Sequence, residues 1–131
     1  MPETISTSSL RIGVVGTCAA GKTTLVQNLR KLGYQAKPIA QEHSYVPTMW
    51  QRLTHPDLLI YLVVSYPLTI ERRKLDWTLQ EYSEQIYRLR HAWENADLVI
   101  FTDLLTPDGV LDCVLAYLGE ADSWHEDKSH F

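Results

Sequence analysis

The sequence predicts an α/β protein with a mostly parallel sheet of about four to five strands and helices on both faces. Short, continuously apolar segments recur along the chain, and each is followed by a segment in which apolar residues repeat at helical spacing. Because strands that alternate with helices are joined by crossovers, they form a parallel sheet with both faces covered. A length of 131 residues, of which 45% are hydrophobic, suits one compact domain.

A strand and a helix are predicted first. The run LRIGVV, residues 10–15, is apolar and β-branched, as expected for a central strand that is buried on both faces. An amphipathic helix is predicted over 22–32, and Gly33 follows where its left-handed cap would lie. Residues 35–40 predict a second strand, which Pro38 confines to an edge of the sheet or to the end of the strand.

The run LLIYLVV, residues 58–64, is the strongest strand signal in the chain. A short helix near 67–75 and a longer helix near 79–95 are expected after it. Thr78 and Glu81 have the spacing of a capping box at the start of the longer helix. The residues expected on the apolar face, at steps of three and four, are Leu75, Leu79, Tyr82, Ile86, Leu89 and Trp93.

The last predicted strand is 98–101, and a final helix is expected to begin at Pro107 and to end at Gly119. No internal repeat interrupts this order of elements. The sequence therefore predicts an amino-terminal tail, one folded α/β domain and a polar carboxyl-terminal tail. These segments are residues 1–9, 10–119 and 120–131.

The composition limits the classes of partner. A formal net charge of -4 and a pI near 5.7 supply no basic field that would attract nucleic acid or anionic lipid, so neither partner is expected. The two cysteines are too few for a disulfide scaffold, which favours a reducing compartment. Because residues 1–9 do not resemble a signal peptide and no apolar run is long enough for a membrane span, we expect a cytoplasmic protein.

The segment GTCAAGKT, residues 16–23, fits the Walker A or P-loop motif G-x-x-x-x-G-K-[ST]. Such a loop curls its backbone N–H groups around phosphate oxygens, and the following helix points its amino terminus at the same anion. Lys22 would approach the β and γ phosphates, and the Thr23 hydroxyl would bind Mg²⁺. Without phosphate, we expect the Lys22 ammonium to be solvated. The predicted nucleotide contacts are Gly16, Thr17, Cys18, Ala19, Ala20, Gly21, Lys22, Thr23 and Thr24.

Around this motif, the chain resembles the small P-loop kinases, the group of thymidylate, deoxynucleoside, shikimate and adenylate kinases. The resemblance covers somewhat under half of the chain, in residues 13–29, 56–73 and 96–118. It implies a three-layer P-loop NTPase fold that binds ATP and Mg²⁺ and transfers the γ-phosphoryl group to a small acceptor. It also implies that Arg72 or Arg73 contacts the nucleotide, and that the loop beginning at Asp103 borders the adenine.

The chain departs from that group in its middle segment. Only 15 residues, Gln41 to His55, separate the second predicted strand from Pro56, and no aspartate follows LLIYLVVS as a Walker B acid would. Glu42 is the best placed substitute, since it follows a strand end, where crevice residues of parallel sheets gather. It would contact a magnesium-bound water or act as a general base, and a solvated surface carboxylate is the alternative. Asp57 and Asp103 are weaker candidates.

Other residues keep two interpretations each. Cys18 is either a small loop residue or an acidic, oxidisable thiol near a helix amino terminus. Trp50 belongs either to the core or to an acceptor pocket. The arginines of the second half form either a lid over a triphosphate or a solvated helix face. They are Arg72, Arg73, Arg88 and Arg90.

Three functions are compatible with these patterns. A small-molecule kinase is the first, and ATP is favoured over GTP because no N-K-x-D or T-K-x-D occurs. A nucleotide-sensing or regulatory protein with little catalysis is the second, and the missing Walker B aspartate favours it. An ATPase completed by a partner subunit is the third. The oligomeric state and the acceptor are left open by the sequence.

Overall fold

The computed structural model describes residues 10–73 and 76–130, with side chains described for 10–72 and 76–119. Four strands form one sheet in the order β2-β1-β3-β4, and all three pairings are parallel. The strands are β1 (Arg11–Gly16), β2 (Gln35–Pro38), β3 (Leu58–Val63) and β4 (Leu98–Phe101). The predicted α/β class and parallel sheet are therefore confirmed, and β2 is an edge strand that ends at Pro38.

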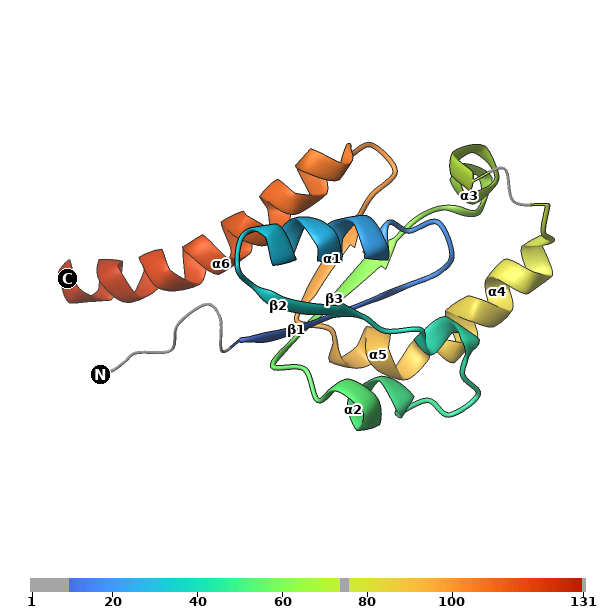
Figure 1. Cartoon of the computed structure of the whole chain (residues 1–131), viewed down its shortest axis with the longest axis horizontal. Helices are drawn as coiled ribbons and strands as arrows, with labels where there is room; N and C mark the ends of the chain where they lie inside the picture. The colour runs from blue at the N-terminus through green and yellow to red at the C-terminus, as the bar shows by residue number, and fades with distance from the viewer. Residues whose placement is uncertain (1–9, 74–75, 131) are drawn as a thin grey trace.

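Helices cover both faces of the sheet. Figure 1 shows α1 and α6 on one face and α2 and α5 on the other, an arrangement compatible with a three-layer α/β fold. The helical elements are α1 (Lys22–Lys31), η2 (Gln41–His43), α2 (Met49–Thr54), α3 (Tyr66–Arg73), α4 (Leu79–Arg88), α5 (Arg90–Asn95) and α6 (Pro107–His130).

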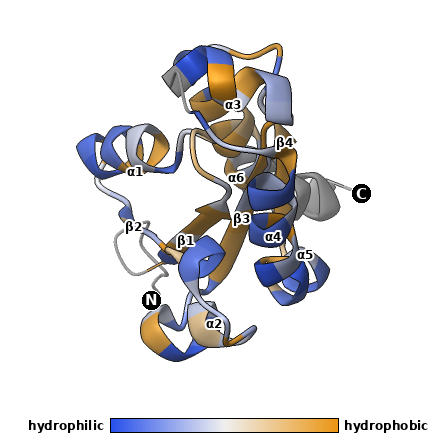
Figure 2. Ribbon diagram, turned by 90° about the vertical axis from the view of Figure 1, so that its right-hand side faces the viewer, coloured by the Kyte–Doolittle hydropathy of each residue, from blue (hydrophilic) through white to orange (hydrophobic). Residues whose placement is uncertain are grey.

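Strand pleating divides the core into two clusters. Alternate residues of β1 and β3 pack against α1 and α6, and the residues between them pack towards α2 and α5. The first cluster includes Ile12, Val14, Leu58, Ile60, Leu62, Leu25, Leu29, Val110 and Val114. The second includes Val15, Leu59, Tyr61, Trp50, Leu89 and Ala92. Figure 2 shows β1 and β3 as the hydrophobic centre, while α4 and α5 are largely hydrophilic.

The predicted helix over 79–95 is interrupted at Leu89, which separates α4 from α5 and is fully buried. The predicted apolar face is confirmed at Leu89 and wrong at Leu79, Ile86 and Trp93. Leu79 and Trp93 are 58% and 49% exposed, whereas the polar Gln85 is only 6% exposed. The reason is that α4 packs chiefly against η2 and the loop after β1, where polar partners are present. Leu75 lies outside the described residues.

The middle segment, residues 41–55, holds η2 and α2. Gln41 organises it through its buried side chain, whose Oε1 accepts the N–H of Trp50 at 2.7 Å. Its Nε2 donates to the carbonyls of Val46 and Arg88, at 2.9 and 3.2 Å. Trp50 packs in the second core cluster and donates from Nε1 to His91, so the core interpretation of this residue is confirmed.

Helix α6 continues beyond Gly119, the residue at which the sequence predicted its end. Gly119 does not adopt the left-handed conformation of a helix cap, in contrast to Gly33, which has φ 94° after α1. The predicted capping box of Thr78 and Glu81 is present at the start of α4. Among residues 10–73 and 76–130, no helix combines the length and apolar character needed to cross a membrane.

Candidate functional site

The loop from Gly16 to Thr23 connects the end of β1 to the start of α1 and is tightly constrained. A Cβ atom at Gly16 would lie 2.7 Å from the Leu62 carbonyl oxygen of β3, so only glycine fits there. Gly21 and Ala19 have φ of 97° and 69°, both in the left-handed region. Two residues of the loop therefore adopt left-handed backbone conformations before α1 begins.

Lys22 folds back over this loop. Its Nζ donates to the carbonyl oxygens of Gly16 and Thr17, at 2.8 and 3.2 Å, and its side chain is 13% exposed. The same ammonium lies 2.8 Å from Oε2 of Glu42. The expectation of a solvated lysine is therefore wrong, because the loop carbonyls and one carboxylate take the place of water around the ammonium.

Glu42 lies in η2, just beyond the end of β2, and is 4% exposed. This burial excludes the alternative of a solvated surface carboxylate. Its Oε2 also lies 3.6 Å from Nε2 of His43, and its Oε1 is buried without a hydrogen-bond partner among the described residues. A buried carboxylate oxygen without a donor is costly, so Glu42 retains capacity for a further donor or a metal ion.

Two side chains of α4 reach the neighbourhood of Lys22 and Glu42: Gln85 contacts the loop at Cys18, and Arg88 contacts η2. Oε1 of Gln85 accepts the backbone N–H of Cys18 at 3.0 Å, and Nε2 of Gln85 donates to the Cys18 Sγ at 3.2 Å. One turn further along, Arg88 donates to the carbonyl oxygen of Glu42 at 3.2 Å and to the hydroxyl of Tyr45 at 2.9 Å. Arg88 therefore bridges α4 and η2.

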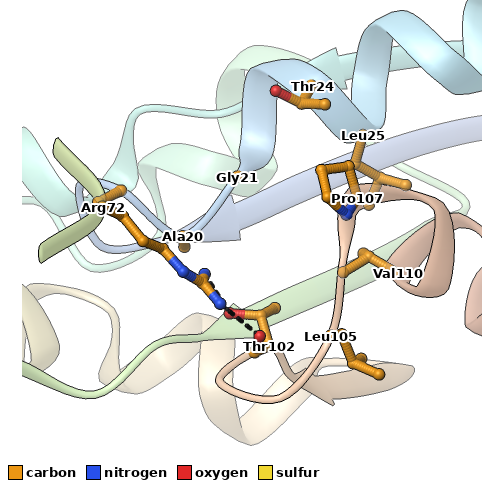
Figure 3. A pocket seen from close by; sticks show the side chains of 10 residues that line it. Ala20, Gly21, Thr24, Leu25, Arg72, Thr102, Leu105, Pro107 and Val110 are labelled. Carbon is orange, nitrogen blue, oxygen red and sulfur yellow. Dashed lines mark hydrogen bonds between the residues drawn. The ribbon is translucent and has the colours of Figure 1, made fainter. Parts of the chain in front are cut away.

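A cavity of about 410 Å³ opens beside the loop, at Ala19, Ala20 and Gly21. Figure 3 shows its apolar wall, formed by Leu25, Leu105, Pro107 and Val110, and Arg72 on the opposite side. Arg72 donates from Nη1 to the Thr102 hydroxyl at 3.0 Å and from Nη2 to the Thr102 carbonyl. Gly21 and Thr24 line the cavity where it meets α1.

The remaining predicted residues fall into separate places. Asp103 is not among the residues that line the described cavity, and its carboxylate instead accepts the N–H of Ser65 at 2.9 Å. Arg90 stacks on Tyr87, with 3.9 Å between its guanidinium carbon and the ring centroid, away from the loop. The side chain of Arg73 lies outside the described residues.

Asp57, the third candidate carboxylate, precedes β3 and accepts the backbone N–H of Arg11 at 2.9 Å. This hydrogen bond, together with the Arg11 side chain, lowers the pKa of the Asp57 carboxyl. In a parallel sheet the strand starts lie at the edge opposite to the strand ends. Asp57 therefore lies away from Lys22 and Glu42, as the sequence predicted.

Three donor types gather beside Lys22. The ligand atoms of Cys18, Glu42 and His43 lie within 4.8 Å of one another, a set that could hold a metal ion. The adjacent ammonium of Lys22 opposes a second cation in the present arrangement. Thr23, predicted as the magnesium ligand, is exposed in the first turn of α1, where its hydroxyl is accessible.

Gly16–Thr23 and Glu42 follow the carboxyl ends of β1 and β2, as the sequence predicted, and Arg72 reaches Thr102 just beyond the end of β4. Sequence reasoning missed Gln85 and gave no specific position to Arg88. In comparisons with known proteins, no protein-family model matches the chain, and no curated protein matches it.

Proposed function

We propose that this chain is an ATP-binding P-loop protein that transfers the γ-phosphoryl group of Mg-ATP to a small acceptor. The observation that carries the proposal is the ion pair between Lys22 and Glu42, which joins the lysine of a complete Walker A motif to a buried carboxylate. The proposal includes a three-layer P-loop NTPase fold, of the kind found in the small P-loop kinases that the sequence resembles.

The adenine is proposed to bind in the cavity between α1 and the start of α6. Its volume of about 410 Å³ lies in the range of small-molecule sites, and its walls combine apolar side chains with one guanidinium. A planar base would pack between Leu25 and Pro107 on one side and Arg72 on the other, since guanidinium groups stack on aromatic rings. Thr24 and Gly21 line the part of the cavity where the ribose and the first phosphate of the nucleotide would lie.

The phosphates would occupy the loop, with the unpaired N–H groups of the first turn of α1 directed at them. Lys22 would leave the carbonyl oxygens of Gly16 and Thr17 and neutralise the β and γ phosphates. Mg²⁺ would be bound by the Thr23 hydroxyl and by phosphate oxygens.

The transfer of Lys22 to phosphate would leave Glu42 without its cation. The carboxylate would then accept the proton of the acceptor hydroxyl as that oxygen attacks the γ-phosphorus and ADP leaves, or would bind a water of the magnesium shell. Its unpartnered Oε1 supports this role, because the oxygen already lacks a donor when Lys22 is in place.

A nucleotide-sensing protein with little catalysis is the second candidate. It is favoured by the arrangement of the middle segment, where Gln41 ties η2, α2 and α4 together by three hydrogen bonds. An acceptor must enter near this segment, so a rigid segment would favour binding over transfer.

ATP labelled in its γ-phosphate, incubated with nucleosides, small alcohols and water, distinguishes these functions. Label in an organic product supports the kinase, label in inorganic phosphate alone supports an ATPase, and tight binding without turnover supports a sensor. Calorimetry with ATP, GTP and their diphosphates at about millimolar concentration provides the direct test of binding. No binding of any of the four by the wild-type chain would refute the proposal.

A further inference from the structure

We propose that Gln85 is a specificity-determining residue that distinguishes a nucleoside triphosphate from a diphosphate in the loop. This inference rests on the proposed function, since it concerns the same nucleotide site. Gln85 lies on α4, 67 positions from Cys18 in the chain, and is 6% exposed. It is therefore a buried polar side chain brought to the loop by the fold alone.

The contact that carries the inference joins the Gln85 carboxamide to the loop backbone. Its Oε1 accepts the N–H of Cys18 at 3.0 Å, and its Nε2 donates to the sulfur of the same residue at 3.2 Å. In a phosphate-binding loop, such backbone N–H groups are the donors that an anion uses. A neutral carboxamide oxygen thus occupies the place of a phosphate oxygen.

The position of Cys18 decides which phosphate would reach its N–H. The proposed base cavity is lined by Ala19, Ala20, Gly21 and Thr24, whereas Cys18 is not among its lining residues and lies beside Glu42 and His43. Phosphates that begin at the cavity would therefore pass Gly21, Ala20 and Ala19 before they reach Cys18. A diphosphate would leave the contact between Gln85 and Cys18 intact, and the γ-phosphate of a triphosphate would meet it.

The γ-phosphate would replace Oε1 as the acceptor, because hydrogen bonds to a charged oxygen are roughly twice as strong as neutral ones. The freed carboxamide would then turn and donate from Nε2 to a γ-phosphate oxygen. Gln85 would thus keep its contact with Cys18 when a diphosphate is bound, and would bind the terminal phosphate when a triphosphate is bound.

The test compares Gln85→Glu with Gln80→Glu, the same change on the exposed face of the same helix. A carboxylate at position 85 still accepts the Cys18 N–H but repels the γ-phosphate and donates nothing to it. Calorimetry should show at least about a tenfold loss of affinity for a non-hydrolysable Mg-ATP analogue. Affinity for Mg-ADP should change less than about threefold, and Gln80→Glu should leave both affinities within about twofold.

A second measurement on the wild-type chain covers the case in which Gln85→Glu does not fold. In nuclear magnetic resonance spectra, the side-chain NH₂ of Gln85 and the amide of Cys18 should shift with the triphosphate analogue and not with Mg-ADP. Equal shifts with both nucleotides, or equal losses of affinity in Gln85→Glu, would overturn this inference alone. Failure of the wild type to bind either nucleotide would overturn the proposed function and this inference with it.

Discussion

The ammonium of Lys22 and the carboxylate of Glu42 are joined across 2.8 Å, with side chains that are 13% and 5% exposed. The pair connects the loop after β1 to the element after β2, so two neighbouring strand ends share one charge interaction. Because triphosphate would compete for the lysine, the same contact is expected to influence both the stability of the free protein and its affinity for nucleotide.

Lys22→Ala should lower the free energy of unfolding of the nucleotide-free protein by about 1–3 kcal/mol, because Glu42 is left buried without its cation. Urea denaturation of the single variants and of Lys22→Ala with Glu42→Gln measures this coupling. The double variant should regain part of the loss. If the two single losses of unfolding free energy simply add in the double variant, the predicted coupling between Lys22 and Glu42 is contradicted.

Glu42→Gln should keep nucleotide affinity within roughly tenfold but reduce turnover on the order of a hundredfold or more, as removal of a general base does. Asp103→Asn should leave turnover nearly unchanged, because Asp103 is engaged by the Ser65 N–H. Steady-state rates of the two variants, measured side by side, decide between the carboxylates. The reverse order of effects would assign the role to Asp103.

Arg72→Ala should weaken nucleotide binding by about tenfold, because it removes the guanidinium that lines the cavity opposite the apolar wall. Arg90→Ala provides the matched control, since Arg90 stacks on Tyr87 outside this cavity and should change the affinity less than about twofold. Calorimetry with ATP measures both. Equal losses would indicate a general electrostatic effect of arginine.

Asp57→Asn should lower the melting temperature at neutral pH and leave nucleotide affinity unchanged. The pKa of Asp57 is held below its usual 3.8 in the folded chain, chiefly by the N–H of Arg11. The carboxylate therefore stabilises the fold above pH 3.8, and this contribution is lost as the pH falls through the lower folded-state pKa. Melting curves of both proteins should converge at acid pH, and a constant difference would contradict this.

The sequence predicted the fold well wherever one local signal decided an element. The apolar runs at β1 and β3 are buried on both faces, and Gly33 and the pair Thr78 and Glu81 mark helix ends as expected. The middle segment could not be predicted in this way. Its order depends on the side chain of Gln41, whose hydrogen bonds to Trp50 and Arg88 join residues distant in the chain.

The candidate site was predictable only in part, for a similar reason. The loop is a contiguous motif, and Glu42 follows a strand end, so both could be assigned from position. Gln85 could not, because a glutamine on a helix is ordinarily a surface residue. Its burial follows from the packing of α4 against the loop, whereas apolar periodicity indicated a different face of that helix.

The order of elements along the chain also determines when the loop after β1 and its partner Gln85 can come together during synthesis. The loop after β1 leaves the ribosome early, but Gln85, which covers its end, follows Cys18 by 67 positions. β1 also requires β3, as the contact between Arg11 and Asp57 across 46 positions illustrates. Such distant pairings form slowly, because the entropy cost of closing a long loop comes before the stabilising contacts are made. The loop can therefore be covered by Gln85 only after α4 has been synthesised, late in the chain relative to the loop itself.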